Sequence, residues 1–210
     1  MREEYHRLPR EKDDSLRARN RARTLIRFLP KGYSPAVYLD FGGADGQITA
    51  QLARLLRPKR AICADLTEWQ NMHHNLSRDQ SVEFVALTSS TLPFPDDSID
   101  FCTALQVLHH VPDQQQTISE LLRILKPGGY LLVREHDSIS KDVSDRIDWV
   151  HYLYEIVVAE KPNWSYLEHK ARYHSIAEWK ELFRDFQLLN VYPARDNDIN
   201  RNAHLLFRKR

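Results

Sequence analysis

The chain has 210 residues, 42% of them hydrophobic, and a formal net charge of +1. This length suits one domain with a real core, and the composition excludes a disordered chain. No apolar run is long enough to span a membrane and the charged amino terminus does not resemble a secretion signal, so we expect a cytoplasmic protein without a membrane partner. Cys63 and Cys102, the two cysteines, are expected to be free buried thiols.

Positive charge is concentrated near the amino terminus. Residues 1–31 carry ten Lys or Arg against five Asp or Glu, and the chain ends in Phe207-Arg-Lys-Arg210. A basic face of this kind can attract a polyanion, although a solvated Arg-rich helix is the simpler interpretation. The pattern predicts a basic helical extension over residues 1–34, followed by one domain over residues 35–210.

Strands and helices are predicted to alternate through most of the chain. Strands are expected near residues 36–40, 60–65, 82–87, 99–105 and 130–134. Helices are expected over residues 13–29, after residue 47, near 68–77 and from 114 to 125. Such alternation is typical of a parallel sheet covered on both faces.

The last third of the sequence is less regular. A strongly periodic helix is predicted over residues 143–160, and a capping box of Ser175 and Glu178 begins another. Two late strands are expected near residues 187–192 and 203–208, separated by a polar loop.

The segment Tyr38–Gly46 reads Tyr-Leu-Asp-Phe-Gly-Gly-Ala-Asp-Gly, which is the pattern of a strand, a tight turn and the start of a helix. Backbone at Gly42 can approach a ligand closely because glycine has no Cβ. Asp65 stands nineteen positions after Gly46, at the end of the next apolar run, where a carboxylate can accept hydrogen bonds from both hydroxyls of a ribose. These features predict an adenosine-containing cofactor. Gln47 stands where a dinucleotide fingerprint needs a third small residue, which disfavours a nicotinamide oxidoreductase.

Four segments together resemble the class I S-adenosylmethionine-dependent methyltransferases, of the type 11-like group. They are the glycine turn after Asp40, Leu92–Phe101 (LPFPDDSIDF), Val107–Val111 (VLHHV) and Leu125–Leu131 (LKPGGYL). The resemblance implies an α/β fold, a Rossmann-like doubly wound, mostly parallel seven-stranded sheet with an antiparallel last strand. It also implies S-adenosylmethionine as cofactor, methyl transfer to an O or N nucleophile, and a substrate lid over residues 138–175.

The same resemblance assigns residues to the cofactor. Asp40 would take its amino group, Asp65 its ribose, and Leu66 would pack on the adenine. Many relatives have Asp where Thr88 stands, and a hydroxyl bonds the adenine edge less strongly than a carboxylate does. The predicted cofactor-binding residues are Asp40, Gly42, Gly43, Ala44, Gly46, Asp65, Leu66, Thr88, Ser89 and Gln106.

Titratable residues gather where the fourth and fifth strands are predicted to end. Glu135 and His136 are candidates to accept a proton from the substrate, the alternative being an ordinary salt-bridged strand end. His109 is a further candidate, although the histidine pair to which it belongs is often structural in relatives.

No metal site is predicted from the spacing. Asp137, Asp148 and His151 are the nearest to a ligand set, but they match no dedicated metal-binding pattern.

The substrate is left open between RNA and a small molecule. The Arg-rich terminus and the aromatic residues Trp164, Tyr166 and Tyr173 favour RNA, yet the residues typical of ribose 2′-O and base-amino methyltransferases are missing. Thr88 and Ala44 instead favour a catalytically silent methyltransferase fold that serves as a binding or scaffold subunit. No oligomeric state is predicted.

Overall fold

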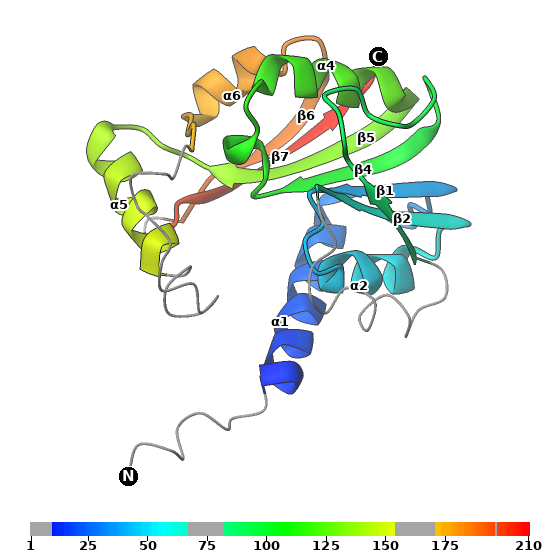
Figure 1. The fold of residues 1–210 in the computed structure, drawn as a ribbon, viewed down its shortest axis with the longest axis horizontal. Helices are drawn as coiled ribbons and strands as arrows, with labels where there is room; N and C mark the ends of the chain where they lie inside the picture. The colour runs from blue at the N-terminus through cyan, green and yellow to red at the C-terminus, as the bar shows by residue number, and fades with distance from the viewer. Residues whose placement is uncertain (1–9, 67–81, 154–170, 196) are drawn as a thin grey trace. The chain divides into compact units, whose positions relative to one another are not determined.

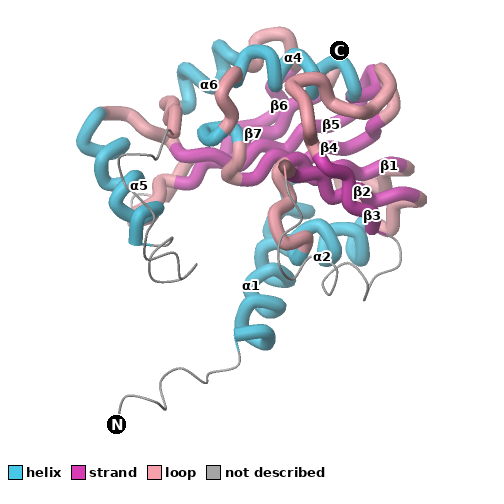
Figure 2. The backbone as a smooth tube through the Cα atoms, viewed as in Figure 1, coloured by secondary structure: helices cyan, strands magenta, loops and turns pink. Residues whose placement is uncertain are grey.

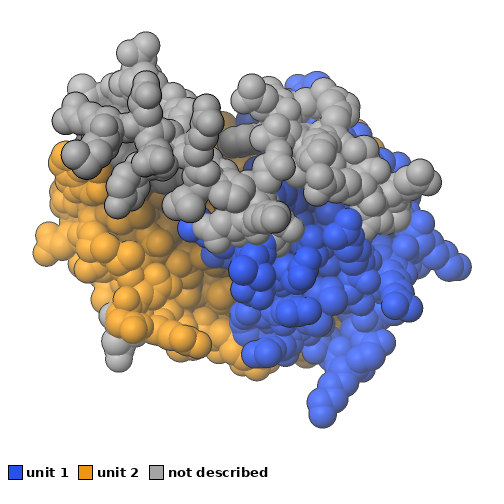
Figure 3. Space-filling model, turned by 90° about the horizontal axis from the view of Figure 1, so that it is seen from below, with its two compact units in different colours: residues 1–88 blue, residues 89–210 orange. Residues whose placement is uncertain are grey.

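The structure is a computed structural model, drawn as a ribbon in Figure 1. It describes residues 10–66, 82–153, 171–195 and 197–210, with side chains from residue 16 onward. Several predicted features lie outside the described residues. They are the helix near residues 68–77, the end of the helix 143–160, and the aromatic residues Trp164 and Tyr166. The chain divides into two compact units, residues 1–88 (unit 1) and 89–210 (unit 2), which Figure 3 shows in two colours.

Unit 1 contains a three-stranded parallel sheet and two longer helices. In it Leu39 lies opposite Ile62 and Cys63 opposite Phe84, so each strand end meets the same edge. Its elements are α1 (Arg10–Leu25), η2 (Ile26–Phe28), β1 (Val37–Phe41), α2 (Gln47–Leu56), β2 (Arg60–Asp65) and β3 (Val82–Ala86).

Helix α1 packs against α2 along an apolar stripe. Ala18, Ala22 and Leu25 are buried on that stripe, while Arg19 and Arg23 are exposed. The helix predicted over residues 13–29 is thus present as α1 and η2, and its arginines from Arg17 to Arg27 are exposed.

Unit 2 contains four strands and most of the remaining helices. In this unit β4 and β5 are parallel, and β7 runs antiparallel between β5 and β6. Figure 2 shows these strands in magenta and the helices in cyan. Its elements are β4 (Ile99–Leu105), η3 (Leu108–His110), α4 (Gln114–Ile124), β5 (Leu125–His136), α5 (Lys141–Leu153), α6 (Ile176–Leu182), β6 (Gln187–Tyr192) and β7 (Asn202–Arg208).

The seven strands follow the order β3-β2-β1-β4-β5-β7-β6. This topology confirms the predicted seven-stranded, mostly parallel sheet with an antiparallel last strand. Strand β5 begins at Leu125, five residues earlier than expected, because Lys126–Gly129 bulges out between two paired positions: Leu125 lies opposite Ile99 and Tyr130 opposite Phe101.

Local capping and aromatic packing fix the helices of unit 2. Asp113 caps α4 by accepting a hydrogen bond from Gln116 N, and the predicted capping box of Ser175 and Glu178 is present at α6. The ring of Phe183 stacks on Phe207 with centroids 4.6 Å apart, which holds α6 on the outer strands.

Helix α5 buries less apolar surface than its sequence pattern predicts. Among its described residues only Ile147 is fully buried, and Trp149 is 56% exposed. Within the described part of the chain, no helix is both long and apolar enough to span a membrane. The prediction of a domain boundary after residue 34 stays a prediction.

Candidate functional site

The turn after β1 is built from residues in the left-handed backbone region. Gly42, Ala44 and Gly46 have φ values of 70°, 48° and 74°. Glycine adopts this region without cost, whereas Ala44 does so with a Cβ present, which is strained by about 1–2 kcal/mol. The backbone N–H of Gly42 donates to Ala64 O at 2.7 Å and so ties the turn to the end of β2.

Gly43 and Asp40 lock the turn against the interior of unit 1. A Cβ on Gly43 would lie 2.5 Å from Cys63 Sγ, so only glycine fits there without movement. Asp40 is 2% exposed, and its Oδ2 accepts a hydrogen bond from Thr49 Oγ1 at 2.6 Å. Burial, followed by the charge of Asp40, raises the pKa of the Cys63 thiol to about 12 and makes it unreactive. Asp40 therefore braces the turn against α2, and its predicted contact with the cofactor's amino group stays a prediction.

Asp65 is anchored beside this turn by two backbone N–H groups. Its Oδ2 accepts from Ala44 N at 2.8 Å, and its Oδ1 accepts from Leu66 N at 2.7 Å. An ionised carboxylate can accept about four hydrogen bonds. Asp65 accepts two from the backbone, so two acceptor positions remain for the hydroxyls of a ribose. The side chain of Leu66 is 73% exposed and offers apolar surface for an adenine. The donor and acceptor set of this turn therefore fits an adenosyl cofactor.

Three further predicted cofactor residues, Thr88, Ser89 and Gln106, follow strands β3 and β4 in the chain. Thr88 and Ser89 are exposed, and Ser89 Oγ donates to Thr91 O at 2.8 Å. Gln106 has a φ of 59° and donates its N–H to Arg134 O at 2.7 Å. Its Nε2 is buried with no hydrogen-bond partner among the described residues. Gln106 is thus held in a strained conformation at the carboxyl end of β4, and a ligand group could satisfy its amide.

Glu135 is fully buried and both of its oxygens are used inside unit 2. Oε1 accepts from Leu108 N at 2.7 Å, and Oε2 lies 2.6 Å from His109 Nδ1. Burial raises the pKa of the Glu135 carboxyl to about 7, against the opposing attraction of His136. This geometry favours a positioning role, in which Glu135 fixes η3 and orients the ring of His109. Its predicted direct proton transfer with a substrate stays a prediction.

His136 is a buried neutral imidazole. Its Nδ1 lies 2.5 Å from Asn200 O, and a carbonyl can only accept, so Nδ1 carries the hydrogen. Burial lowers the pKa of His136 to about 4. The lone pair is therefore on Nε2, which lies 3.2 Å from His151 Nε2.

His151 extends this chain of contacts into helix α5. Its Nδ1 lies 3.0 Å from the hydroxyl of Tyr173, which itself donates to Asp148 Oδ1 at 2.7 Å. Asp148 and His151 lie three residues apart on α5, but Tyr173 comes from a distant segment, so only the fold joins the three.

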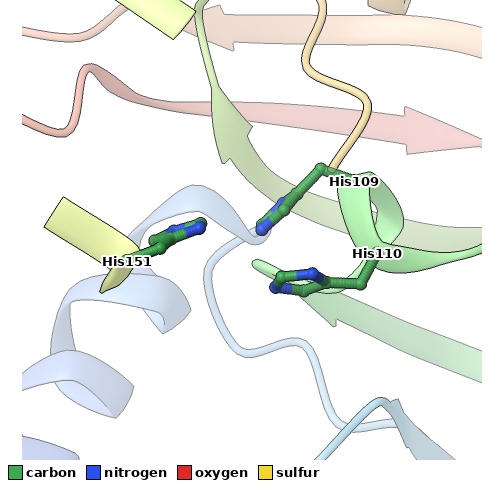
Figure 4. A group of neighbouring side chains, drawn as sticks. All are labelled: His109, His110 and His151. Atoms are coloured by element: carbon green, nitrogen blue, oxygen red, sulfur yellow. The ribbon is translucent and has the colours of Figure 1, made fainter. Parts of the chain in front are cut away.

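Histidine rings converge at the carboxyl ends of β4 and β5. Figure 4 shows His109 and His110 from η3 facing His151 from α5. The ring centroid of His109 lies 4.0 Å from that of His110 and 5.2 Å from that of His151. Asp137 is not part of this group, because its Oδ2 pairs with Arg201 Nη2 at 2.6 Å and its Oδ1 accepts from Ile176 N. The structure therefore replaces the suggested set of Asp137, Asp148 and His151 with a cluster of histidines.

The part of the chain that carries the glycine turn, Asp65 and His109 matches a known protein family. The family described as "Methyltransferase domain" matches residues 39–133, from β1 and the glycine turn to β5. The predicted resemblance to the class I S-adenosylmethionine-dependent methyltransferases, of the type 11-like group, is thus confirmed. The family's cofactor, S-adenosylmethionine, agrees with the acceptor set found at Asp65, so the predicted family and cofactor are confirmed.

Two curated proteins from bacteria are similar to this chain. It is 33% identical over 154 residues to the ubiquinone/menaquinone biosynthesis C-methyltransferase UbiE of Vibrio vulnificus, covering 65% of this chain and 57% of that protein. The UbiE protein of Pasteurella multocida is 30% identical over 172 residues, covering 73% and 63%. The chain thus spans about 57–63% of the length of these relatives.

Solved structures share the methyltransferase fold at low identity. A putative methyltransferase of Haloferax volcanii, in complex with the Trm112 methyltransferase activator, has a TM-score of 0.66 and 16% identity over 93% of both chains. The 1,6-didemethyltoxoflavin-N1-methyltransferase of Burkholderia thailandensis, with bound S-adenosylhomocysteine, has a TM-score of 0.67 and 19% identity, covering 96% of this chain and 90% of that one. These likenesses confirm the Rossmann-like methyltransferase fold.

Proposed function

We propose that this methyltransferase transfers a methyl group from S-adenosylmethionine to a ring carbon of a small aromatic molecule. The observation that carries the cofactor half of the proposal is the doubly anchored Asp65 carboxylate beside the glycine turn. The acceptor half is supported by two relatives at 30–33% identity that are named as C-methyltransferases of ubiquinone and menaquinone biosynthesis.

Methyl transfer requires the protein chiefly to orient the methyl donor and the acceptor toward each other. S-adenosylmethionine supplies an activated methyl group on a sulfonium. The residues around Asp65 would hold the ribose and adenine, and alignment of two reactants can lower a barrier by about 7–11 kcal/mol in favourable cases. No covalent intermediate with the protein is needed.

Methylation of a ring carbon also releases one proton. The ring carbon gains the methyl group and loses its hydrogen, while the sulfonium becomes a neutral thioether. In unit 2, His109 is held by Glu135, and the low pKa of His136, caused by its burial, keeps that imidazole neutral. An imidazole accepts a proton well only when its pKa lies near the working pH, so the lowered pKa makes His136 a weak acceptor and leaves His109 as the candidate for this step.

Cofactor binding tests the first half of the proposal. Calorimetric titration should give saturable binding of S-adenosylmethionine and S-adenosylhomocysteine but not of NAD. Asp65→Ala should weaken that binding by about 10- to 100-fold, because hydrogen bonds to a charged group contribute roughly 1.5–3 kcal/mol. Asp45→Asn, a change in the same turn at a carboxylate that accepts hydrogen bonds from Gln47, serves as the matched control. Wild-type affinity in Asp65→Ala would overturn the site assignment.

Turnover tests the second half. The protein is incubated with methyl-deuterated cofactor and a panel of phenols and hydroquinones, with a pool of RNA assayed in parallel, and products are located by mass spectrometry. We expect the label on a ring carbon. Label on oxygen or nitrogen, or on RNA, would contradict the proposed acceptor, and cofactor binding without any product would favour a silent scaffold.

A further inference from the structure

We propose that His109, His110 and His151 form a binding site for a divalent transition-metal ion, with Zn²⁺ as the ion to test. One ring nitrogen from each of the three residues lies within 4.8 Å of the other two. All three residues belong to unit 2, and the inference is independent of the proposed methyl transfer.

The three rings need only small movements to meet one ion. Zn²⁺–N bonds of about 2.0–2.1 Å in a tetrahedral site place the ligand nitrogens roughly 3.3 Å apart. His110 is exposed and His151 is half-buried, so both side chains have room to close the remaining distance. His109 is buried and supplies the fixed corner of the site (Figure 4).

Two of the three histidines already have the supporting contacts that metal ligands use. A ligating histidine commonly directs its second ring nitrogen to a carboxylate, which sets its tautomer and ring orientation. His109 Nδ1 lies 2.6 Å from Glu135 Oε2, which directs Nε2 toward the cluster. His151 Nδ1 lies 3.0 Å from the hydroxyl of Tyr173, behind which stands the Asp148 carboxylate. Glu135 and Asp148 would also offset the charge of a bound cation.

The contact between His136 and His151 indicates the same preference for a cation. Their Nε2 atoms lie 3.2 Å apart, and two ring nitrogens attract each other only when a proton or a metal ion lies between them.

The chemistry of the ligands selects the class of metal. Neutral imidazoles suit Zn²⁺, Cu²⁺ and Ni²⁺, whereas Mg²⁺ and Ca²⁺ take oxygen ligands. Cys63 and Cys102 are buried within strands β2 and β4, and neither is part of the cluster. Mg²⁺ is therefore the negative control for any binding measurement.

The test is calorimetric titration of the full chain with Zn²⁺, after treatment with EDTA and dialysis, in the absence of cofactor and substrate. We expect an equimolar site with a dissociation constant in the micromolar range or below, and no such site for Mg²⁺. His110→Ala and His151→Ala should each weaken binding at least about tenfold, since losing even a supporting contact costs about 10–100-fold. His204→Ala, which removes a half-buried histidine of β7 outside the cluster, is the matched control.

Two results would overturn the inference: no equimolar Zn²⁺ binding by the wild-type protein, or wild-type affinity in both His110→Ala and His151→Ala. Because His110 is exposed, its variant should fold, and a far-UV circular dichroism spectrum checks this. Glu135→Gln provides an independent readout and should weaken Zn²⁺ binding through His109. The measurement needs no methyl transfer, so its failure leaves the proposed function untouched. A ring nitrogen bound to a metal cannot accept a proton, so loading the site would slow any reaction that uses His109 as the acceptor.

Discussion

Replacing Gly43 by alanine should destabilise unit 1 by steric overlap alone. The new Cβ would lie 2.5 Å from Cys63 Sγ, 3.1 Å from Thr49 Oγ1 and 3.3 Å from Asp40 Oδ2. An unstrained contact needs about 3.5–4.0 Å, so the sulfur and the turn must separate by roughly 1 Å. Cys63 is fully buried against Val82 and Phe84, which leaves the thiol no free space to enter. Overpacking of this kind costs about 1–3 kcal/mol.

Backbone strain does not contribute to this cost, because the φ of Gly43 lies outside the left-handed region. Removing the sulfur should therefore rescue the variant. Cys63→Ala alone should cost about 1 kcal/mol, the value typical of losing one buried methylene-sized group. The double variant should be more stable than the sum of the single changes predicts, by about 1–2 kcal/mol.

Urea unfolding followed by circular dichroism gives the four free energies of unfolding that this cycle needs. Cofactor affinity of the same proteins reports whether the glycine turn has moved. Two results would refute the steric reasoning: an unfolding free energy of Gly43→Ala equal to that of the wild type, or changes that add within about 0.5 kcal/mol.

Two further predictions concern unit 2. The native pKa of His136, about 4 against 6.5, means that its contribution to stability is present above about pH 6.5 and is lost as the pH falls toward 4. This shift corresponds to roughly 3 kcal/mol. As the pH falls from 6.5 to 4, the urea midpoint of the wild type should therefore fall more steeply than that of His136→Gln. Equal dependence of the two midpoints on pH would contradict the argument. Asp113→Ala removes the cap of α4 and should lower the free energy of unfolding by about 1 kcal/mol, whereas Asp113→Asn should keep most of it; equal losses would show that the cap is not the cause.

Much of the fold could be predicted because it depends on local pattern. The alternation of apolar runs with capped helices indicated the parallel strands, and the glycine turn with Asp65 indicated the cofactor. These signals are short in sequence and each has one physical meaning, such as a turn without Cβ atoms or a carboxylate at a strand end. The early start of β5 was not predicted, because the bulge at Lys126–Gly129 depends on how β5 pairs with β4.

The state of the titratable residues was decided only by the tertiary structure. The sequence pattern indicated Glu135 and His136 as candidates at a sheet edge, but both are buried: Glu135 packs against η3, and His136 contacts Asn200 and His151. Burial is what raises the pKa of Glu135 and lowers that of His136, and no spacing in the sequence encodes it. The cluster of His109, His110 and His151 likewise joins segments about forty residues apart. Short local motifs thus predicted the family resemblance and the cofactor turn, whereas packing determined which histidines lie together and which ring nitrogens carry hydrogen.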